Sequence, residues 1–152
     1  MKLLLSFLLT LLTLNPSNGD YEYKKIFKNN QLIAEGWEKD GQKERYWKYY
    51  FQNGQIEKEG HYLHDQKNNY WKYYFTNGQI QQEGRFKNDL EEKWWLFYNQ
   101  KGEITKKCEF KHGKRHGYTF IYKNNELNKA EKYSEGELVG SWTDYASFYR
   151  DN

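Results

Sequence analysis

Apolar and polar side chains alternate along most of the chain, in short runs separated by polar turns. In the run 47–51, alternation sends Trp47 and Tyr49 to one face of an extended strand. Lys48 and Tyr50 then point to the opposite face. This period of two predicts β-strands, because a helix would place its apolar residues three or four positions apart.

Turn signals separate these runs. Asn53-Gly54 follows the run 47–51. An Asn-Gly pair between alternating runs is the strongest short-range hairpin signal, because both residues tolerate a positive φ. A second strand is expected from Gln55 to Tyr62, and a polar turn at 64–67 then returns the chain, with Asp or Gly suited to a left-handed conformation. The pattern predicts a β-hairpin followed by a return turn.

The hairpin pattern recurs with a period of about 24 residues, which is typical of repeat architectures. The segment 46–56 reappears as 70–80 with one difference in eleven positions. The next copy begins at Trp94-Trp95, and a slightly shorter step from Trp95 leads to the following copy at Tyr118. The expected units cover 23–46, 47–70, 71–94, 95–117 and 118–141, with a partial unit at 142–152. The prediction is an all-β fold: an elongated antiparallel meander of tandem β-hairpin repeats of about 24 residues, each packing on its neighbours.

The composition agrees with a β fold. Aromatic residues make up 20% of the chain, and aromatic side chains favour strands. A disordered chain with 30% charged residues would normally lack them. The net charge is +3 with acids and bases interspersed, whereas nucleic-acid binders usually combine a pI above ~9 with clustered Lys and Arg. We therefore expect no nucleic-acid partner.

Residues 1–19 have the composition of a secretory signal peptide. Lys2 precedes an apolar run, and the small residues Ser17 and Gly19 stand where a signal peptidase requires them. The apolar run is shorter than the ~20 residues of a transmembrane helix, although an uncleaved anchor is the alternative. Cleavage near Gly19 would leave a repeat domain at 20–152, exported to the periplasm or the medium.

The histidines are the first candidates for metal ligands. His61 and His64 are three positions apart, and His112 and His116 are four apart. Either spacing brings two ligands together on a helix but not on strands and turns. We therefore expect exposed histidines and no metal.

Catalytic chemistry also lacks a clear set of residues. Carboxylates such as Glu57 and Glu59 occupy alternating positions opposite lysines, which is typical of a solvated sheet face. Cys108 stands where earlier units carry Gly60 and Gly84, which indicates a structural thiol. No glycine-rich phosphate loop is present. We expect no enzyme activity and no cofactor.

A basic cluster lies between Lys106 and Arg115, but acidic neighbours such as Glu109 offset it. Binding to phospholipid headgroups or another acidic surface is one interpretation of this cluster. A solvated strand face is the favoured alternative.

The repeat unit resembles the MORN-type repeat, in the bacterial variant of the YwqK-like antitoxin family. The resemblance rests on Trp47, Asn53-Gly54, Gly60 and Tyr62, which match that pattern and recur one unit later. The Gly that usually precedes the Trp is Tyr46 here. The family implies a hairpin array and protein–protein contacts or membrane-proximal scaffolding. Its antitoxin association implies a second possibility, an antitoxin or immunity protein.

The repeated aromatic blocks supply the candidate binding surface. Because one face of the sheet suffices for packing, Tyr46, Tyr50, Tyr70 and Tyr74 are expected to form a ladder on the other face. The alternative is that a thin sheet needs aromatic residues on both faces. The leading hypothesis is an exported, non-catalytic scaffold that binds another protein; a carbohydrate-binding protein of the envelope is the third alternative. The oligomeric state is open, since either edge strand could pair with another chain.

Overall fold

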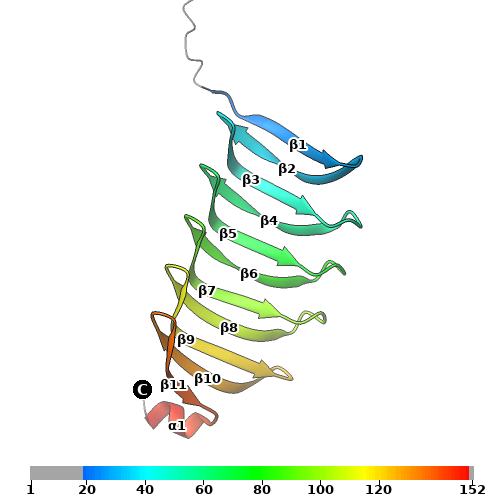
Figure 1. Cartoon of the computed structure of the whole chain (residues 1–152). Coiled ribbons are helices and arrows are strands. Elements are labelled where there is room, and N and C mark those ends of the chain that lie inside the picture. Colours follow the sequence, from blue (N-terminus) through cyan, green and yellow to red (C-terminus); the bar gives the residue numbers. More distant parts are fainter. Residues whose placement is uncertain (1–18, 151–152) are drawn as a thin grey trace, which may run out of the picture.

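The computed structural model describes residues 19–150, which form one antiparallel sheet of 11 strands and a short helix (Figure 1). Strands adjacent in sequence are adjacent in the sheet throughout. The strands are β1 (Glu22–Lys28), β2 (Gln31–Lys39), β3 (Gln42–Tyr50), β4 (Ile56–Leu63), β5 (Gln66–Tyr74), β6 (Ile80–Lys87), β7 (Leu90–Tyr98), β8 (Ile104–Lys111), β9 (Lys114–Lys123), β10 (Glu126–Ser134) and β11 (Glu137–Trp142), followed by α1 (Tyr145–Arg150). The predicted all-β meander of successive hairpins is confirmed. The predicted signal peptide, apart from Gly19, lies outside the described residues.

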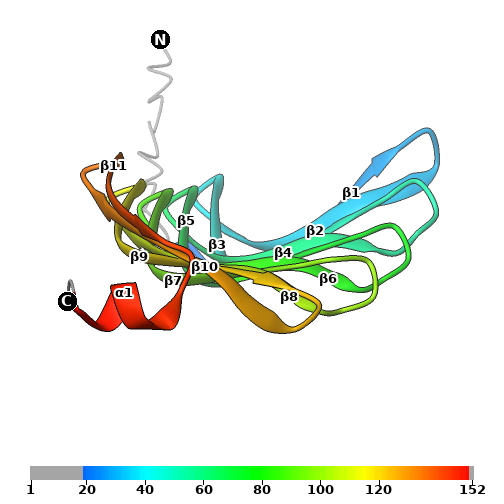
Figure 2. The ribbon, with the colours of Figure 1, turned by 90° about the horizontal axis from the view of Figure 1, so that it is seen from below.

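A bulge recurs at the same place in the aromatic strands. Arg45, Asn69 and Lys93 have φ values of 59°, 59° and 60°, and Gly117 takes this place in β9 with a φ of 81°. Bulges bend a strand and increase its twist. Seen along the stack, the hairpins are curved into a trough (Figure 2). The bulge also explains why β3 begins at Gln42, before the predicted run: it interrupts the alternation on which that prediction depended.

The core is a ladder of tryptophan and glycine on one face of the sheet, here called the inner face. Trp47, Trp71 and Trp95 are buried, with at most 2% of each side chain exposed. Trp71 lies directly between Gly60 on β4 and Gly84 on β6. Its indole Nε1 donates a hydrogen bond of 3.0 Å to the carbonyl oxygen of residue 61. The neighbouring tryptophans make the same bond at 2.8 and 3.1 Å, so the ladder repeats with each hairpin.

Glycine is required at these positions for space. A Cβ atom on Gly60 would lie 2.3 Å from Cδ2 of Trp71, and the same clash occurs between Gly84 and Trp95 at 2.2 Å. Tyr62 meets Trp71 edge-on at a ring separation of 5.0 Å. Aromatic pairs of this geometry contribute about 0.5–1.5 kcal/mol beyond area burial. Each unit therefore completes its core with residues of the adjacent unit.

The ladder changes at its C-terminal end. Cys108 takes the glycine position, as the sequence indicated, and it pairs with Thr119. Thr119 is 1% exposed and occupies the tryptophan position, one full repeat after Trp95. The alignment that placed Tyr118 at this step is therefore wrong by one residue. A smaller residue at the tryptophan position leaves room for a side chain at the glycine position, which explains Cys108.

The two kinds of turn have different geometries. At Asn53-Gly54 only the glycine has a positive φ, 82°, and the loop is closed by a hydrogen bond of 2.8 Å from the Phe51 N–H to the Gln55 carbonyl. The Asn53 side chain accepts from the Gln55 N–H at 3.1 Å and donates to the next hairpin. At the return turn both His64 and Asp65 have positive φ values, 50° and 64°. The expected left-handed return turn is confirmed.

The end of the chain differs from the expected partial unit. Trp142 pairs with Ala130, one position beyond the tryptophan ladder, and so lies on the opposite face. The chain then forms α1, which the alternation pattern does not predict. Asp144 caps this helix, since its Oδ1 accepts a hydrogen bond of 2.7 Å from the Ser147 N–H. A local capping signal was thus present in the sequence.

Candidate functional site

The four tyrosines expected to form a ladder share one face of the sheet, here called the outer face. Tyr46 and Tyr50 flank Lys48 at alternating positions, on the side opposite Trp47. Tyr70 and Tyr74 hold the equivalent positions on β5. Helix α1 packs on this same face, where its Phe148 contacts Tyr118 at a ring separation of 5.7 Å. Because α1 lies outside the trough in Figure 2, the outer face is the convex one.

Glutamates one strand away fix the tyrosine hydroxyls. Tyr74 Oη donates a hydrogen bond of 2.6 Å to Glu59 Oε1, and Tyr50 donates one of 2.5 Å to Glu35. Glu59 also acts on Tyr46: burial first, and then the charge of this glutamate, raise the pKa of Tyr46 to about 12. Tyr46 and Tyr74 therefore converge on one carboxylate from two different hairpins.

The next unit repeats this arrangement. Tyr98 donates to Glu83 at 2.6 Å, and burial together with Glu83 raises the pKa of Tyr70. The hydrogen bond from Tyr50 is the largest of the effects that lower the pKa of Glu35. Sequence reasoning missed Tyr98, Glu35 and Glu83, and it placed Glu59 on a solvated sheet face without its tyrosine partners. A signal for them existed, because the glutamates recur once in each unit, immediately before the glycines of the ladder.

A row of alternating charge crosses the middle of the outer face. Glu35 and Glu59 each lie opposite a lysine on both neighbouring strands, as the sequence suggested for Glu59, and Glu83 lies opposite Lys72 on one side. The row runs Lys25, Glu35, Lys48, Glu59, Lys72, Glu83. Opposite charges at such positions contribute roughly 0.2–1 kcal/mol per pair. Tyrosine hydroxyls donate hydrogen bonds to these carboxylates, and lysines lie opposite them. The glutamates therefore hold the side chains of the outer face in place.

The row changes character from β7 onward. Leu96 takes the next lysine position, and Lys107 takes the next glutamate position. Lys107 Nζ lies 4.7 Å from the ring centre of Trp94, which stacks on Phe120 at 5.9 Å. The outer face thus passes from charged and tyrosine-rich to apolar toward α1. Of the predicted basic cluster, Lys107 is on the outer face and Lys106 lies over Phe97 on the inner face, so the sheet separates the two.

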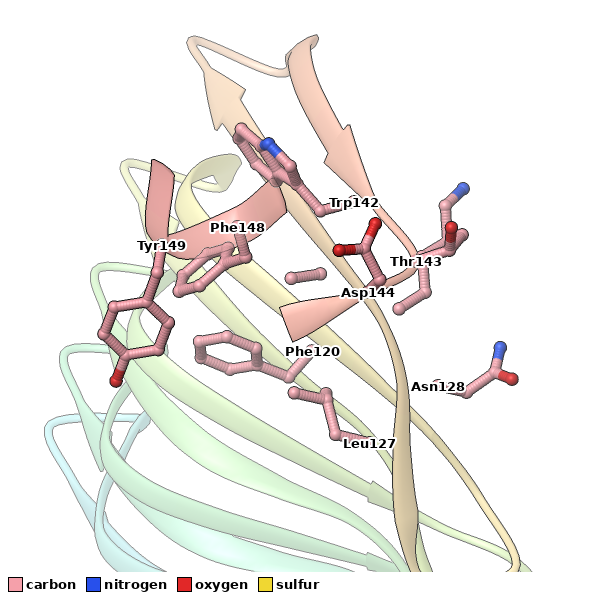
Figure 3. A pocket seen from close by; sticks show the side chains of 10 residues that line it. Phe120, Leu127, Asn128, Trp142, Thr143, Asp144, Phe148 and Tyr149 are labelled. Carbon is pink, nitrogen blue, oxygen red and sulfur yellow. The ribbon is translucent and has the colours of Figure 1, made fainter. Parts of the chain in front are cut away.

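A cavity of about 200 Å³ lies between α1 and the end of the sheet. Figure 3 shows Phe120, Leu127, Trp142 and Phe148 around it. Asp144 at its rim is engaged with the first turn of α1. The lining of this cavity is mainly apolar, so the cavity suits one large apolar side chain better than it suits a catalytic site.

The histidines have structural partners. His64 Nδ1 lies 2.7 Å from Glu44 Oε1, which also accepts the His64 backbone N–H at 2.9 Å. Glu92 and His112 repeat this pair. Within residues 19–150, no three His, Cys, Asp or Glu side chains are grouped so that they would hold a metal ion.

Cys108 is buried in the ladder. Burial raises the pKa of its thiol, and this outweighs the opposing effects of Thr119 and nearby cations. The thiol is therefore protonated near neutral pH, which makes it a poor nucleophile. Its position supports the structural role expected from the sequence.

These features define a β-hairpin repeat protein made of a single sheet, with its core on the inner face and a tyrosine–glutamate network on the outer face. No family model matches the chain, and comparison with curated proteins gives no match. Among solved structures, the chain is similar to the Glycosylation Associate Protein (Gap123) complex from Streptococcus agalactiae, at 15% identity and a TM-score of 0.38. The match covers 91% of this chain and 24% of that chain, and carries no argument about function. Across the described residues, no helix has the length and apolar character to span a membrane.

Proposed function

We propose that the chain is an exported, non-catalytic scaffold of the MORN type, whose outer face binds another protein. The observation that carries this proposal is the position of Tyr46, Tyr50, Tyr70 and Tyr74. They lie on the face opposite the tryptophan core, and Tyr46 and Tyr70 expose 36% and 39% of their surface. The core is complete without these rings, so their repetition is best explained by contact with a partner.

The tyrosine–glutamate network favours binding because it orders the surface in advance. A tyrosine held by a hydrogen bond of 2.6 Å, as Tyr74 is by Glu59, has already lost much of its side-chain freedom. Binding then costs less entropy than it would with mobile side chains. Tyrosine is also the residue that gives large amphipathic contact with few rotatable bonds.

The test is capture of proteins from the source organism with residues 20–152 as bait, followed by mass spectrometry. We expect a Tyr50→Ala/Tyr74→Ala variant to lose the partner, while its circular dichroism spectrum keeps the β signature. A Tyr50→Phe/Tyr74→Phe variant, which keeps the rings and loses the hydroxyls, should retain part of the binding. Folded Ala variants that capture the same proteins as the original chain would refute the proposal.

The same capture separates the alternatives. A toxin among the proteins lost by the Ala variant would make the chain an immunity protein. Retention on a glycan column, with no captured protein, would favour the carbohydrate-binding alternative. Export is tested separately, by sequencing the N-terminus of the protein as the organism produces it: we expect a start near Asp20, whereas a retained Met1 would exclude cleavage.

A further inference from the structure

We infer that the partner contributes an amphipathic α-helix, which lies along the outer face parallel to the long axis of the sheet, with one heptad per hairpin. This inference rests on the proposed function, since it specifies what the outer face binds. It comes from a second feature of that face, an apolar stripe beside the charged row.

The stripe consists of tyrosine and aliphatic residues at the Asn-Gly end of the hairpins. Tyr50 pairs directly with Ile56, and directly paired residues point to the same face. Three further pairs continue the pattern: Tyr74 with Ile80, Tyr98 with Ile104, and Tyr122 with Leu127. Ile104 is 38% exposed and Leu127 is 51% exposed. Ordered apolar residues that recur along a whole face mark an interaction surface.

The spacing of the stripe suits a helix. Adjacent strands are about 4.8 Å apart, so equivalent residues of consecutive hairpins are about 9.6 Å apart. A helix rises about 1.5 Å per residue, so residues seven positions apart are about 10.5 Å apart. The mismatch is about 1 Å per step and about 3 Å over the three steps between four hairpins, which flexible side chains can absorb. A helix with apolar residues in a heptad pattern would therefore meet one aliphatic residue per hairpin.

The chain itself places a helix on this face. Phe148 of α1 contacts Trp142 and Tyr118, at ring separations of 5.5 and 5.7 Å. Although α1 lies across the end of the sheet, it covers the place where the outer face has become apolar. Leu127, the last residue of the stripe, also lines the cavity beside α1 (Figure 3). An apolar side chain at the end of a bound helix would fit this cavity.

The chemistry of the stripe favours a helix over a glycan. A glycan needs free hydrogen-bonding groups, but the hydroxyls of Tyr50, Tyr74 and Tyr98 already donate to glutamates. What these tyrosines offer is ring surface, and the aliphatic partners add only apolar area. The charged row that borders the stripe alternates in sign, so the flanking positions of the helix should carry both Lys and Glu.

The experiment measures binding of synthetic helical peptides to residues 20–152 by isothermal titration calorimetry. The peptides contain two, three or four heptads, with Leu at two positions of each heptad and Lys and Glu elsewhere. We expect the affinity to rise about tenfold per heptad, since each added heptad buries roughly one more leucine. A four-heptad control of the same composition, with its leucines distributed around the helix, should bind at least a hundredfold more weakly.

Substitutions in the chain locate the site. Ile56→Lys/Ile80→Lys removes two contacts, so we expect the affinity for the four-heptad peptide to fall about a hundredfold. The matched control is Gln42→Lys/Gln66→Lys, which adds the same charge at the far end of strands β3 and β5 and should leave the affinity unchanged. If the first variant does not fold, Ile56→Thr/Ile80→Thr serves in its place.

Three results would overturn the inference: equal binding of the control peptide, no dependence on heptad number, or full affinity in the folded Ile56 and Ile80 variant. The proposed function is judged separately, by the capture experiment. If the peptides fail but Tyr50→Ala/Tyr74→Ala still loses the captured protein, the outer face binds a protein in another conformation. Binding of chito-oligosaccharides that is abolished by the stripe substitutions would replace the helix with a glycan.

Discussion

The glycine–tryptophan ladder allows a quantitative test at Gly60. A methyl group there would lie 2.3 Å from Trp71 Cδ2 and 2.5 Å from Cγ, far inside van der Waals contact. The indole is fully buried, so it cannot move without disturbing its neighbours. Overpacking costs about 1–3 kcal/mol, and losing a buried tryptophan costs about 3–5 kcal/mol. We expect Gly60→Ala to lower the free energy of unfolding by about 3 kcal/mol.

The chain contains the compensating pair. At its C-terminal end, Cys108 and Thr119 stand in place of the glycine and the tryptophan. Gly60→Cys and Trp71→Thr should therefore each be costly alone, at about 3 kcal/mol or more. Combined, they should cost less than the sum, with a coupling of about 1–3 kcal/mol.

The assay is urea unfolding of the four chains of this double-mutant cycle, followed by circular dichroism. Gly41→Ala is the control, because Gly41 has a φ of 77° and no atom lies near its added Cβ. It should cost about 1–2 kcal/mol through the backbone alone, equally in the Trp71→Thr background. A neutral Gly60→Cys, or strictly additive costs, would show that the glycine is not required to admit the indole.

Three further outcomes are expected. Cys108 should resist a thiol reagent in the folded protein and react fully in denaturant; rapid labelling of the native chain, measured by mass spectrometry, would contradict its burial. Because the pKa of Tyr46 is raised from its ordinary value of 10.0 to about 12, the stability it contributes is complete below pH 10 and is lost as the pH rises toward 12. Thermal melts over this range should show a falling midpoint, less so for Tyr46→Phe. Asp65→Ala should cost about 1–2 kcal/mol, since it removes the acceptor of the Lys43 N–H and places Ala at a φ of 64°; Asp65→Asn should recover most of this in urea unfolding.

Much of the fold was predictable because its contacts are local. Each strand pairs with the next strand in sequence, so the repeated turn signals define both the strands and their order. The alternation around Lys48 also places Tyr46 and Tyr50 correctly on the face opposite Trp47. Prediction failed where alternation is interrupted, at the Arg45 bulge, and where threonine replaces the tryptophan of the repeat, at Thr119.

The sequence predicted the tyrosines of the candidate site but not their hydrogen bonds to glutamates, for a different reason. Tyr46 and Tyr74 meet at Glu59, although the two tyrosines belong to different repeat units. Their meeting depends on the register of two hairpins, which the bulges determine. The pattern of one strand gives the face of a side chain but not its neighbour two strands away.

The sequence by itself determined a meander of tandem hairpins and its period, because turn chemistry and period-two alternation act over short stretches of chain. Only the tertiary structure decided which face of the sheet holds the buried core and which face stays exposed. The recurring bulges curve the sheet, and the indoles fill the inner face over the glycines. The tyrosines and the apolar stripe lie on the convex outer face, where α1 also packs. In the sequence, the two faces of a single-layer sheet look chemically similar. The curvature of the sheet and the space over Gly60 and Gly84 make the two faces different.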